Sequence, residues 1–259
     1  MLKKIIAIFR YKSYLFQNKG IFFFKFIENI SYQVSNLFIK IINKKFFFII
    51  KLDDDNPRLF NSKIFTYKKY KNLQINANIR KINSSWVKKE DVKVISQLLN
   101  KNFKNKKISG LCQGTRNGSE QKFFKKYLNN SKILGTDISP TAKKFKDTIQ
   151  WDFNKYKGQF FRKYDFVYSN SHDHSFNLKK TILIWLKYLK KDGYLILQNH
   201  KSHGSLNSNN LDSSSIETEL LPFVIMQWTN GEYKVETFLN PKSSNSQRDK
   251  IFFINKNNN

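Results

Sequence analysis

The sequence is poor in several features that would narrow its function. A single cysteine, Cys112, among 259 residues excludes an internal disulfide and fits a reducing compartment. No apolar run reaches the ~20 residues that a membrane-spanning helix needs. The first residues have too short an apolar run, and no small-residue cleavage site, for a signal peptide. We therefore expect a cytoplasmic protein.

Acidic residues are also scarce, with 19 Asp and Glu against 47 Lys and Arg, for a formal net charge of +28. Such an excess can serve nucleic acid or an anionic membrane surface. However, Lys, Asn, Ile and Phe are abundant together, and AT-rich codons favour all four. Codon bias therefore explains the charge without a partner, and we expect nucleic acid to be the less favoured partner. The sequence indicates no oligomeric state.

The chain divides into a basic, aromatic N-terminal extension at 1–84, a domain at 85–255 and a frayed tail at 256–259. The extension is predicted to be helical, with short extended candidates such as 63–67. Two interpretations of residues 1–50 stay open. They form either a peripheral contact with the inner face of a membrane or a helical packing against the domain or a second subunit.

From residue 107 onwards, strand patterns alternate with helical ones. The final two strands form an antiparallel pair. This order predicts an α/β fold with a doubly wound, seven-stranded, mostly parallel sheet and an antiparallel C-terminal edge hairpin. Residues 191–193 are interpreted as the stop signal of the preceding helix. Strands are expected at 108–113, 132–137, 148–153, 164–168, 194–198, 233–238 and 250–254, and helices at 86–99, 119–129, 140–146, 178–190 and 216–228.

A glycine-rich turn follows the first strand and leads directly into a helix. Gly114 and Gly118 in this turn allow a ligand to approach the backbone closely, and Gly114 is the strongest single candidate. In a doubly wound sheet the ligand lies at the carboxyl ends of the strands. The turn therefore predicts a ligand-binding crevice, although glycine-rich turns after strands are often only turns.

Two carboxylates follow the next two strands and would meet at the same crevice. Asp137 can accept hydrogen bonds from both hydroxyls of a ribose, or it can cap the following helix. Asp152 lies between Trp151 and Phe153. A carboxylate flanked by rings suits a purine, with a ring stacking on the base, although an aromatic core strand with an exposed Asp has the same pattern.

In this order, the motifs resemble a poorly characterised subgroup of the class I S-adenosylmethionine-dependent methyltransferases. The resemblance implies an enzyme (EC 2.1.1.-) with S-adenosylmethionine as cofactor. It also implies that the glycine turn cradles the methionine part, Asp137 holds the ribose, and Asp152 with Phe153 contacts the adenine. The motifs are 112–118, 135–137, 151–153, 164–170 and 186–197, and the candidate cofactor-binding residues are Gly114, Arg116, Gly118, Glu120, Asp137, Ile138, Asp152, Phe153 and Asn170.

Two residues depart from this family's pattern. Cys112 stands where the family has an acidic residue, and Arg116 stands where it has the middle glycine. A thiol cannot replace a carboxylate that orders the ammonium group of the ligand. Glu120 on the first helical turn and the backbone carbonyl of Asn170 are the candidates to compensate.

All four histidines follow two neighbouring strands of the expected sheet. His172 and His174 follow the fourth strand, and His200 and His203 follow the fifth. An imidazole suits removal of a proton from a methyl acceptor, which makes His174 and His172 the candidate catalytic residues. Loop or capping roles, or a metal site, are the alternatives. We expect no metal, because neighbouring residues on a loop rarely converge on one ion.

We therefore expect methyl transfer to a small molecule, a glycan or a lipid-linked group. An RNA or nucleic-acid methyltransferase is one alternative, but 169–174 lacks the Asn-Pro-Pro-Tyr type of turn that clamps a base. The other alternative is a non-catalytic domain of the same fold that its N-terminal extension holds to a membrane or a partner.

Overall fold

The computed structural model describes residues 66–104, 106–200, 212–214, 216, 218–239 and 248–257. These residues belong to one compact unit, residues 54–259. Our expectations for residues 1–65 and for His203 lie outside the described residues. Within the described part of the chain, no helix has the length and apolar character needed to cross a membrane.

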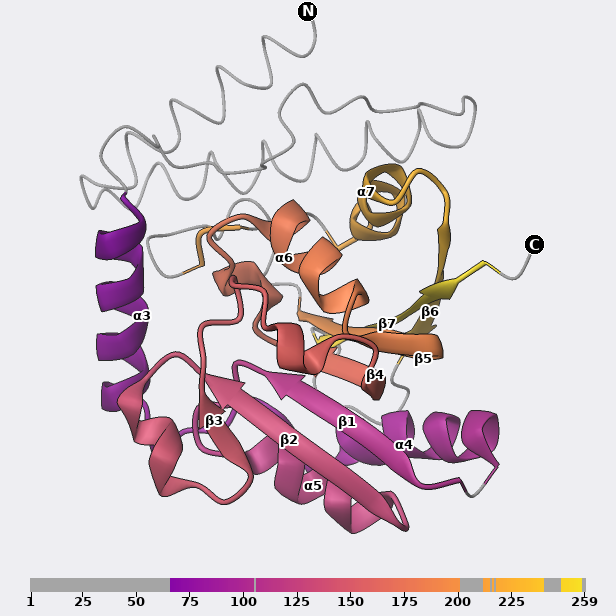
Figure 1. The fold of residues 1–259 in the computed structure, drawn as a ribbon, viewed down its shortest axis with the longest axis horizontal. Helices are drawn as coiled ribbons and strands as arrows, with labels where there is room; N and C mark the ends of the chain where they lie inside the picture. The colour runs from indigo at the N-terminus through magenta and orange to yellow at the C-terminus, as the bar shows by residue number, and fades with distance from the viewer. Residues whose placement is uncertain are drawn as a thin grey trace, which may run out of the picture. The chain divides into compact units, whose positions relative to one another are not determined.

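The described residues form a seven-stranded sheet in the order β3-β2-β1-β4-β5-β7-β6 (Figure 1). The pairs from β3 to β5 are parallel, and β7 pairs antiparallel with both β5 and β6. The predicted fold class is therefore confirmed. The strands are β1 (Ile108–Gln113), β2 (Ser131–Asp137), β3 (Thr148–Gln150), β4 (Tyr164–Ser169), β5 (Leu189–His200), β6 (Tyr233–Leu239) and β7 (Arg248–Lys256).

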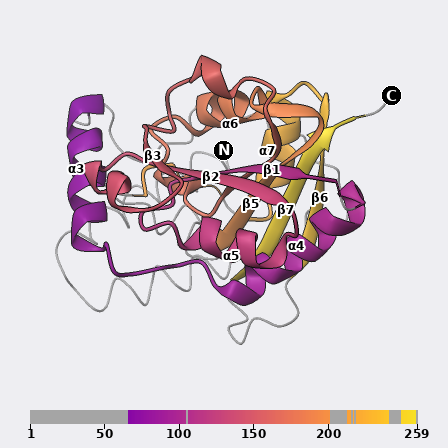
Figure 2. The same cartoon turned by 60° about the horizontal axis from the view of Figure 1, so that its bottom comes forward.

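Helices cover both faces of this sheet (Figures 1 and 2). One face carries α4 (Lys89–Phe103) and α5 (Ser119–Tyr127), and the other carries α6 (Leu178–Leu186) and α7 (Leu221–Trp228). A further helix, α3 (Tyr67–Arg80), stands beyond β3. Short 3-10 turns at Pro140–Lys144, Gly158–Phe160 and His172–His174 complete the connections.

Aromatic and aliphatic side chains fill the layer between the sheet and the helices α4 and α5. Phe124 of α5 packs against Phe166 and Tyr168 of β4, with ring centroids 4.8 and 5.2 Å apart. Cys112 is fully buried in the same cluster, so the thiol is part of the core. The amphipathic period in the sequence predicted these helices because α4 buries Val92, Ile95 and Leu99, and α5 packs its aromatic residues on the same core.

Helix α3 lies within the extension that was expected to be helical, but its place beside the sheet was not expected. The short extended segment expected at 63–67 is wrong at Tyr67, where α3 begins; Thr66 caps the helix by accepting a hydrogen bond from the Lys69 amide at 3.3 Å. The buried residues of α3 are Tyr70, Gln74 and Ala77. They recur at helical spacing, but two of them carry polar groups, so the segment has no apolar stripe to detect.

The end of α6 also differs, because this helix stops at Leu186 and β5 already begins at Leu189. Gly193 therefore lies inside a strand and is not a helix stop. The strand register shifts here: Tyr164 pairs with Leu189, and Phe166 then pairs with Tyr194. A Cβ at Gly193 would lie 3.0 Å from the Tyr164 carbonyl oxygen, so this glycine permits the close backbone approach at the bulge.

Gly110 in β1 is a second position where the packing requires the absence of a side chain. A Cβ there would lie 2.3 Å from the Phe166 ring, whereas a Cβ at Gly158 would meet nothing closer than 3.9 Å. We expect Gly110→Ala to lower the free energy of unfolding by ~1–3 kcal/mol, the usual cost of overpacking. Urea denaturation measures this, with Gly158→Ala as the matched control. Equal stability of the two variants would contradict the packing argument.

Candidate functional site

The glycine turn after β1 is held against the end of β2. The amides of Gly114 and Thr115 both donate to the Thr136 carbonyl oxygen, at 2.9 and 3.0 Å. Gly114 has φ +78°, and a Cβ at this position would lie 3.1 Å from Ser171 and 3.2 Å from Phe153. The turn therefore lies at the carboxyl ends of β1, β2 and β4, where Gly114 leaves no room for a side chain.

Asp137 ends β2 directly beside this turn and is only 1% exposed. Its carboxylate accepts hydrogen bonds from the backbone amides of Ser139 at 2.8 Å and Arg116 at 3.1 Å. The amide group of Asn78 on α3 donates to both carboxylate oxygens, at 3.1 and 3.2 Å. Burial raises the pKa of Asp137 although these hydrogen bonds oppose the shift.

Asp152 follows β3 in a turn of its own, because β3 ends at Gln150 and not at the expected residue 153. Its carboxylate accepts hydrogen bonds from the Asn154 backbone amide at 3.1 Å, the Asn154 side chain at 3.0 Å and the Tyr67 hydroxyl of α3. Trp185 of α6 holds the neighbouring Phe153 in place. Its indole N–H donates to the Phe153 carbonyl oxygen at 3.1 Å, and the two rings pack edge to face.

Helix α3 closes the crevice between these groups. Its Tyr67 and Tyr70 form an aromatic cluster with Phe176, with ring centroids 5.0 to 5.6 Å apart. The cavity left below the helix has a volume of about 30 Å³, whereas pockets for drug-sized ligands have about 300–1,000 Å³. It is lined by Tyr70, Gln74, Asn78, Gly114, Arg116, Asp137, Ile138, Asp152, Phe153, Asn154, Ser171 and His174.

A histidine–carboxylate pair lies at the same pocket. The Nδ1 atom of His174 is 3.1 Å from Oδ1 of Asp212, and the His174 carbonyl oxygen accepts a hydrogen bond from Tyr70 at 2.7 Å. His172 is 3% exposed and does not line the pocket. Potential ligand atoms of Asp173, His174 and Asp212 lie within 4.8 Å of one another, a set that could hold a metal ion.

Arg116, in the middle of the glycine turn, joins the turn to α3. It adopts φ +46°, and its guanidinium group donates to the Asn78 side chain at 3.2 Å and to the Ser84 carbonyl oxygen at 3.1 Å. Burial lowers the pKa of this group, while the charges of Asp137 and Glu120 oppose the shift. Arg116 therefore holds the Asn78 side chain that in turn bonds to Asp137.

Glu120 lies on the first turn of α5 and is fully enclosed. Burial raises the pKa of its carboxyl group to about 8, although its backbone hydrogen bond, the charge of Arg116 and a hydrogen bond from Asn170 all act in the opposite direction. Its Oε2 atom has no hydrogen-bond partner among the described residues. A buried carboxyl group with an unsatisfied oxygen is costly, so it requires an explanation.

Solved structures with the same fold identify the architecture. One is 1,6-didemethyltoxoflavin-N1-methyltransferase of Burkholderia thailandensis, with S-adenosylhomocysteine bound: identity is 10%, 76% of this chain and 93% of that chain are covered, and the TM-score is 0.56. Another is a plantazolicin methyltransferase, also with S-adenosylhomocysteine bound. Its sequence identity is 13%, the match covers 73% of this chain and 98% of that chain, and the TM-score is 0.55. This is the fold of the class I S-adenosylmethionine-dependent methyltransferases. No protein-family model and no curated protein sequence matches the chain.

Within this methyltransferase fold, most of the expected site residues come together. Gly114, Arg116, Asp137, Ile138, Asp152, Phe153 and His174 line one pocket. The pocket lining does not include the other four expected residues, Gly118, Glu120, Asn170 and His172. The side chain of His200 is outside the described residues, as is the whole of His203.

Sequence reasoning missed the contributions of α3 and of Asp212. Tyr67, Tyr70, Gln74 and Asn78 reach the site from a helix whose exposed face and buried face are both polar, so no periodic signal marked them. Asp212 lies in a Ser- and Asn-rich segment that carries no recognisable motif. Its contact with His174, 38 positions earlier in the chain, indicates a role that the sequence alone does not show.

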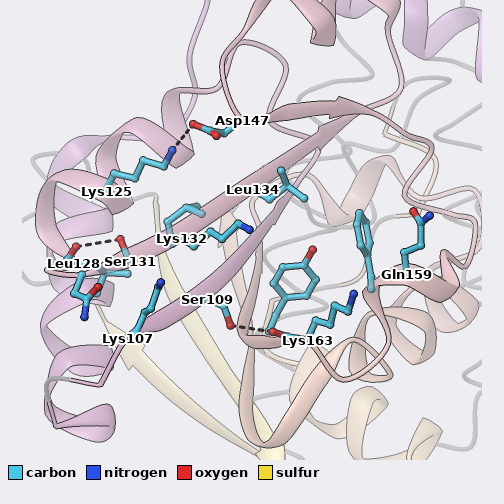
Figure 3. Close-up of a pocket in the computed structure, with 14 residues that line it drawn as sticks. Lys107, Ser109, Lys125, Leu128, Ser131, Lys132, Leu134, Asp147, Gln159 and Lys163 are labelled. Atoms are coloured by element: carbon cyan, nitrogen blue, oxygen red, sulfur yellow. Dashed lines mark hydrogen bonds and ion pairs between the residues drawn. The ribbon is translucent and has the colours of Figure 1, made fainter.

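A larger cavity, of about 910 Å³, opens near the amino-terminal ends of β1 and β2 (Figure 3). Four lysines, at 107, 125, 132 and 163, are among its fourteen lining residues, and Lys125 pairs with Asp147. The composition of the chain alone would supply about two or three basic residues in a set of this size. This cavity lies away from the carboxyl ends of the parallel strands, where the candidate site is found.

The raised pKa of Glu120 predicts a pH-dependent stability. The pKa of Glu120 is about 8 in the folded protein, against the usual 4.5. The folded protein therefore holds this proton more tightly than the unfolded chain does. This difference stabilises the folded state at low pH, and the stabilisation is lost as the pH rises towards 8. Gln at this position cannot ionise. We therefore expect Glu120→Gln to gain stability relative to the wild type between pH 5 and pH 8, on the order of 3 kcal/mol.

Urea unfolding of both proteins at the two pH values measures this difference. Glu90→Gln, on the exposed surface of α4, is the control and should show no such trend. A stability difference between Glu120→Gln and the wild type that stays constant with pH would contradict the assignment.

Proposed function

We propose that this protein is an S-adenosylmethionine-dependent methyltransferase that acts on a small-molecule acceptor in the cytoplasm. The observation that carries the proposal is the pair of carboxylates, Asp137 and Asp152, that line one pocket together with Gly114. The toxoflavin and plantazolicin enzymes of the same fold modify natural products, which supports a small-molecule acceptor over nucleic acid.

The residues at the pocket fit this cofactor in chemical type and in order. Gly114 lines the pocket and has no room for a side chain beside Ser171 and Phe153, so at this position the turn can offer only its backbone to the methionine part. Asp137 presents two acceptor oxygens, which suit two ribose hydroxyls. Asp152 and the Phe153 ring suit an exocyclic amine and the face of a purine.

Bound S-adenosylmethionine would supply a methyl group carried on a positively charged sulfur. A nucleophilic atom of the acceptor would take this methyl group, and S-adenosylhomocysteine, a neutral thioether, would be the leaving group. The chain must then align the acceptor and remove its proton where it carries one. We assign the removal of this proton to His174. Asp212 lies 3.1 Å from Nδ1 and orients the ring, so that Nε2, on the opposite side of the imidazole, is the basic atom.

Helix α3 must shift before the cofactor can bind, because about 30 Å³ of cavity cannot admit a nucleoside. The contacts that would break are polar ones, from Asn78 to Asp137 and from Tyr67 to Asp152. Two ribose hydroxyls and the adenine amine would replace these three hydrogen bonds. We therefore expect the exchange to cost little in hydrogen bonding.

Replacement of Asp137 tests the proposed cofactor site. Calorimetry with S-adenosylhomocysteine should detect binding to the wild-type protein and a loss of at least ~30-fold in affinity for Asp137→Ala, because a charged acceptor for two hydroxyls is removed. Hydrogen exchange of the α3 amides should increase when the wild type binds this ligand.

The matched control is Asp147→Ala, a carboxylate that pairs with Lys125 outside the pocket. Its affinity should equal that of the wild type. Absence of binding by the folded wild-type protein would contradict the proposed function and favour a non-catalytic domain. Unchanged affinity in Asp137→Ala would contradict the ribose assignment alone.

Replacement of His174 separates catalysis from cofactor binding. Release of S-adenosylhomocysteine is first screened across phenols, amines and carboxylic acids of low molecular weight. With an acceptor found in this way, we expect His174→Gln to lower kcat by ~100-fold or more and to leave the affinity for S-adenosylhomocysteine unchanged. Lys180→Gln, exposed on α6, is the control. A wild-type rate in His174→Gln would eliminate it as the base.

A further inference from the structure

The end of β1 offers no negative charge to a ligand in the crevice. Cys112, the position at which the family has an acidic residue, is fully buried in the core. Burial, followed by the nearby charge of Glu120, raises the pKa of this thiol well above its usual value, with Lys125 acting in the opposite direction. The thiol therefore stays neutral, and a ligand ammonium group needs another partner.

Glu120 is the carboxyl group nearest in the sequence to the glycine turn. It follows Gly118 and Ser119 at the start of α5, and only 6% of the residue is exposed to solvent. Asn170, which follows β4, donates a hydrogen bond to the carboxyl group. The group therefore lies between the turn after β1 and the end of β4, with Oε2 unsatisfied.

The charged and titratable groups around Glu120 do not neutralise it. Arg116 and Asp137 act on it from the turn and from β2 with opposite signs. Cys112 of β1 and Tyr168 of β4 lie beneath it, and Glu120 contributes to the raised pKa of both. Arg116 directs its guanidinium group to Asn78 and Ser84, so no described cation pairs directly with this carboxyl group.

We propose that Glu120 binds the α-ammonium group of the methionine part of S-adenosylmethionine, from α5 instead of from the end of β1. This inference rests on the proposed function. An ammonium group would satisfy the Oε2 atom that the protein leaves without a partner. It would also supply the positive charge that a buried carboxylate requires.

Ion pairing at this site couples cofactor binding to proton release. With its pKa at about 8, the Glu120 carboxyl group carries a proton at pH 7 in the free protein. The ligand ammonium favours the carboxylate form, so binding transfers that proton to the buffer. The affinity for the amino-acid-bearing ligand therefore rises with pH between 6 and 7.5.

Two ligands that differ only in the amino-acid part provide the test. S-adenosylhomocysteine carries the ammonium group, whereas 5′-methylthioadenosine has the same nucleoside and thioether without it. We expect Glu120→Gln to bind S-adenosylhomocysteine ~10- to 100-fold more weakly, as for loss of a charged hydrogen bond, and 5′-methylthioadenosine within about twofold of the wild type. Glu120→Asp, which keeps the charge, should recover part of the loss, and Glu90→Gln should behave as the wild type.

Calorimetry in buffers with different ionisation enthalpies counts the protons released. Wild-type protein at pH 7 should release a proton with S-adenosylhomocysteine and none with 5′-methylthioadenosine. This measurement needs no variant, so it decides the matter even if Glu120→Gln does not fold.

Equal weakening of both ligands in Glu120→Gln, or equal proton release with both ligands, would overturn the role of Glu120 and leave the proposed function intact. Undiminished affinity for S-adenosylhomocysteine in this variant would overturn it as well. If the wild type bound neither ligand, the proposed function would fail, and this inference would fail with it.

Discussion

The site depends on one pair of hydrogen bonds, from the Gly114 and Thr115 amides to the Thr136 carbonyl oxygen. They hold the turn after β1 against the end of β2, so that the Arg116 amide faces the Asp137 carboxylate. Turn and carboxylate therefore share one rigid frame that the central parallel strands support. The remaining contributions, from α3 and from Asp212, come to this frame from outside the sheet.

The sheet could be predicted from the sequence because its strands are short apolar runs with clear turns between them. β1 appears at its expected bounds, and the carboxylates at 137 and 152 appear at the expected edge. Strand register could not be predicted, since the bulge before Gly193 depends on the approach of β4. The contribution of helix α3 to the site was missed for a related reason, because its inner face contacts a polar crevice instead of an apolar core.

The two residues that differ from the methyltransferase motifs, which the sequence otherwise resembles, have different physical consequences. Cys112 is an apolar core residue where those motifs have an acidic one, and the buried carboxyl group of Glu120 acts on its thiol. Arg116 places a non-glycine residue at φ +46°, which costs of the order of 1 kcal/mol. Its hydrogen bonds to Asn78 and Ser84 offset that cost and explain why a long cation is accommodated in a glycine-rich turn.

The connection between α3 and α4 is bonded to the same turn, since the Asn117 side chain donates to the Ile82 carbonyl oxygen at 3.1 Å and Arg116 donates to that of Ser84. One added or deleted residue in this connection would change the phase of α3 by about 100°. Asn78 and Tyr67 would then face away from their carboxylates. Unlike most surface loops, this segment has a fixed length, and insertions here would alter the site while the sheet stays intact.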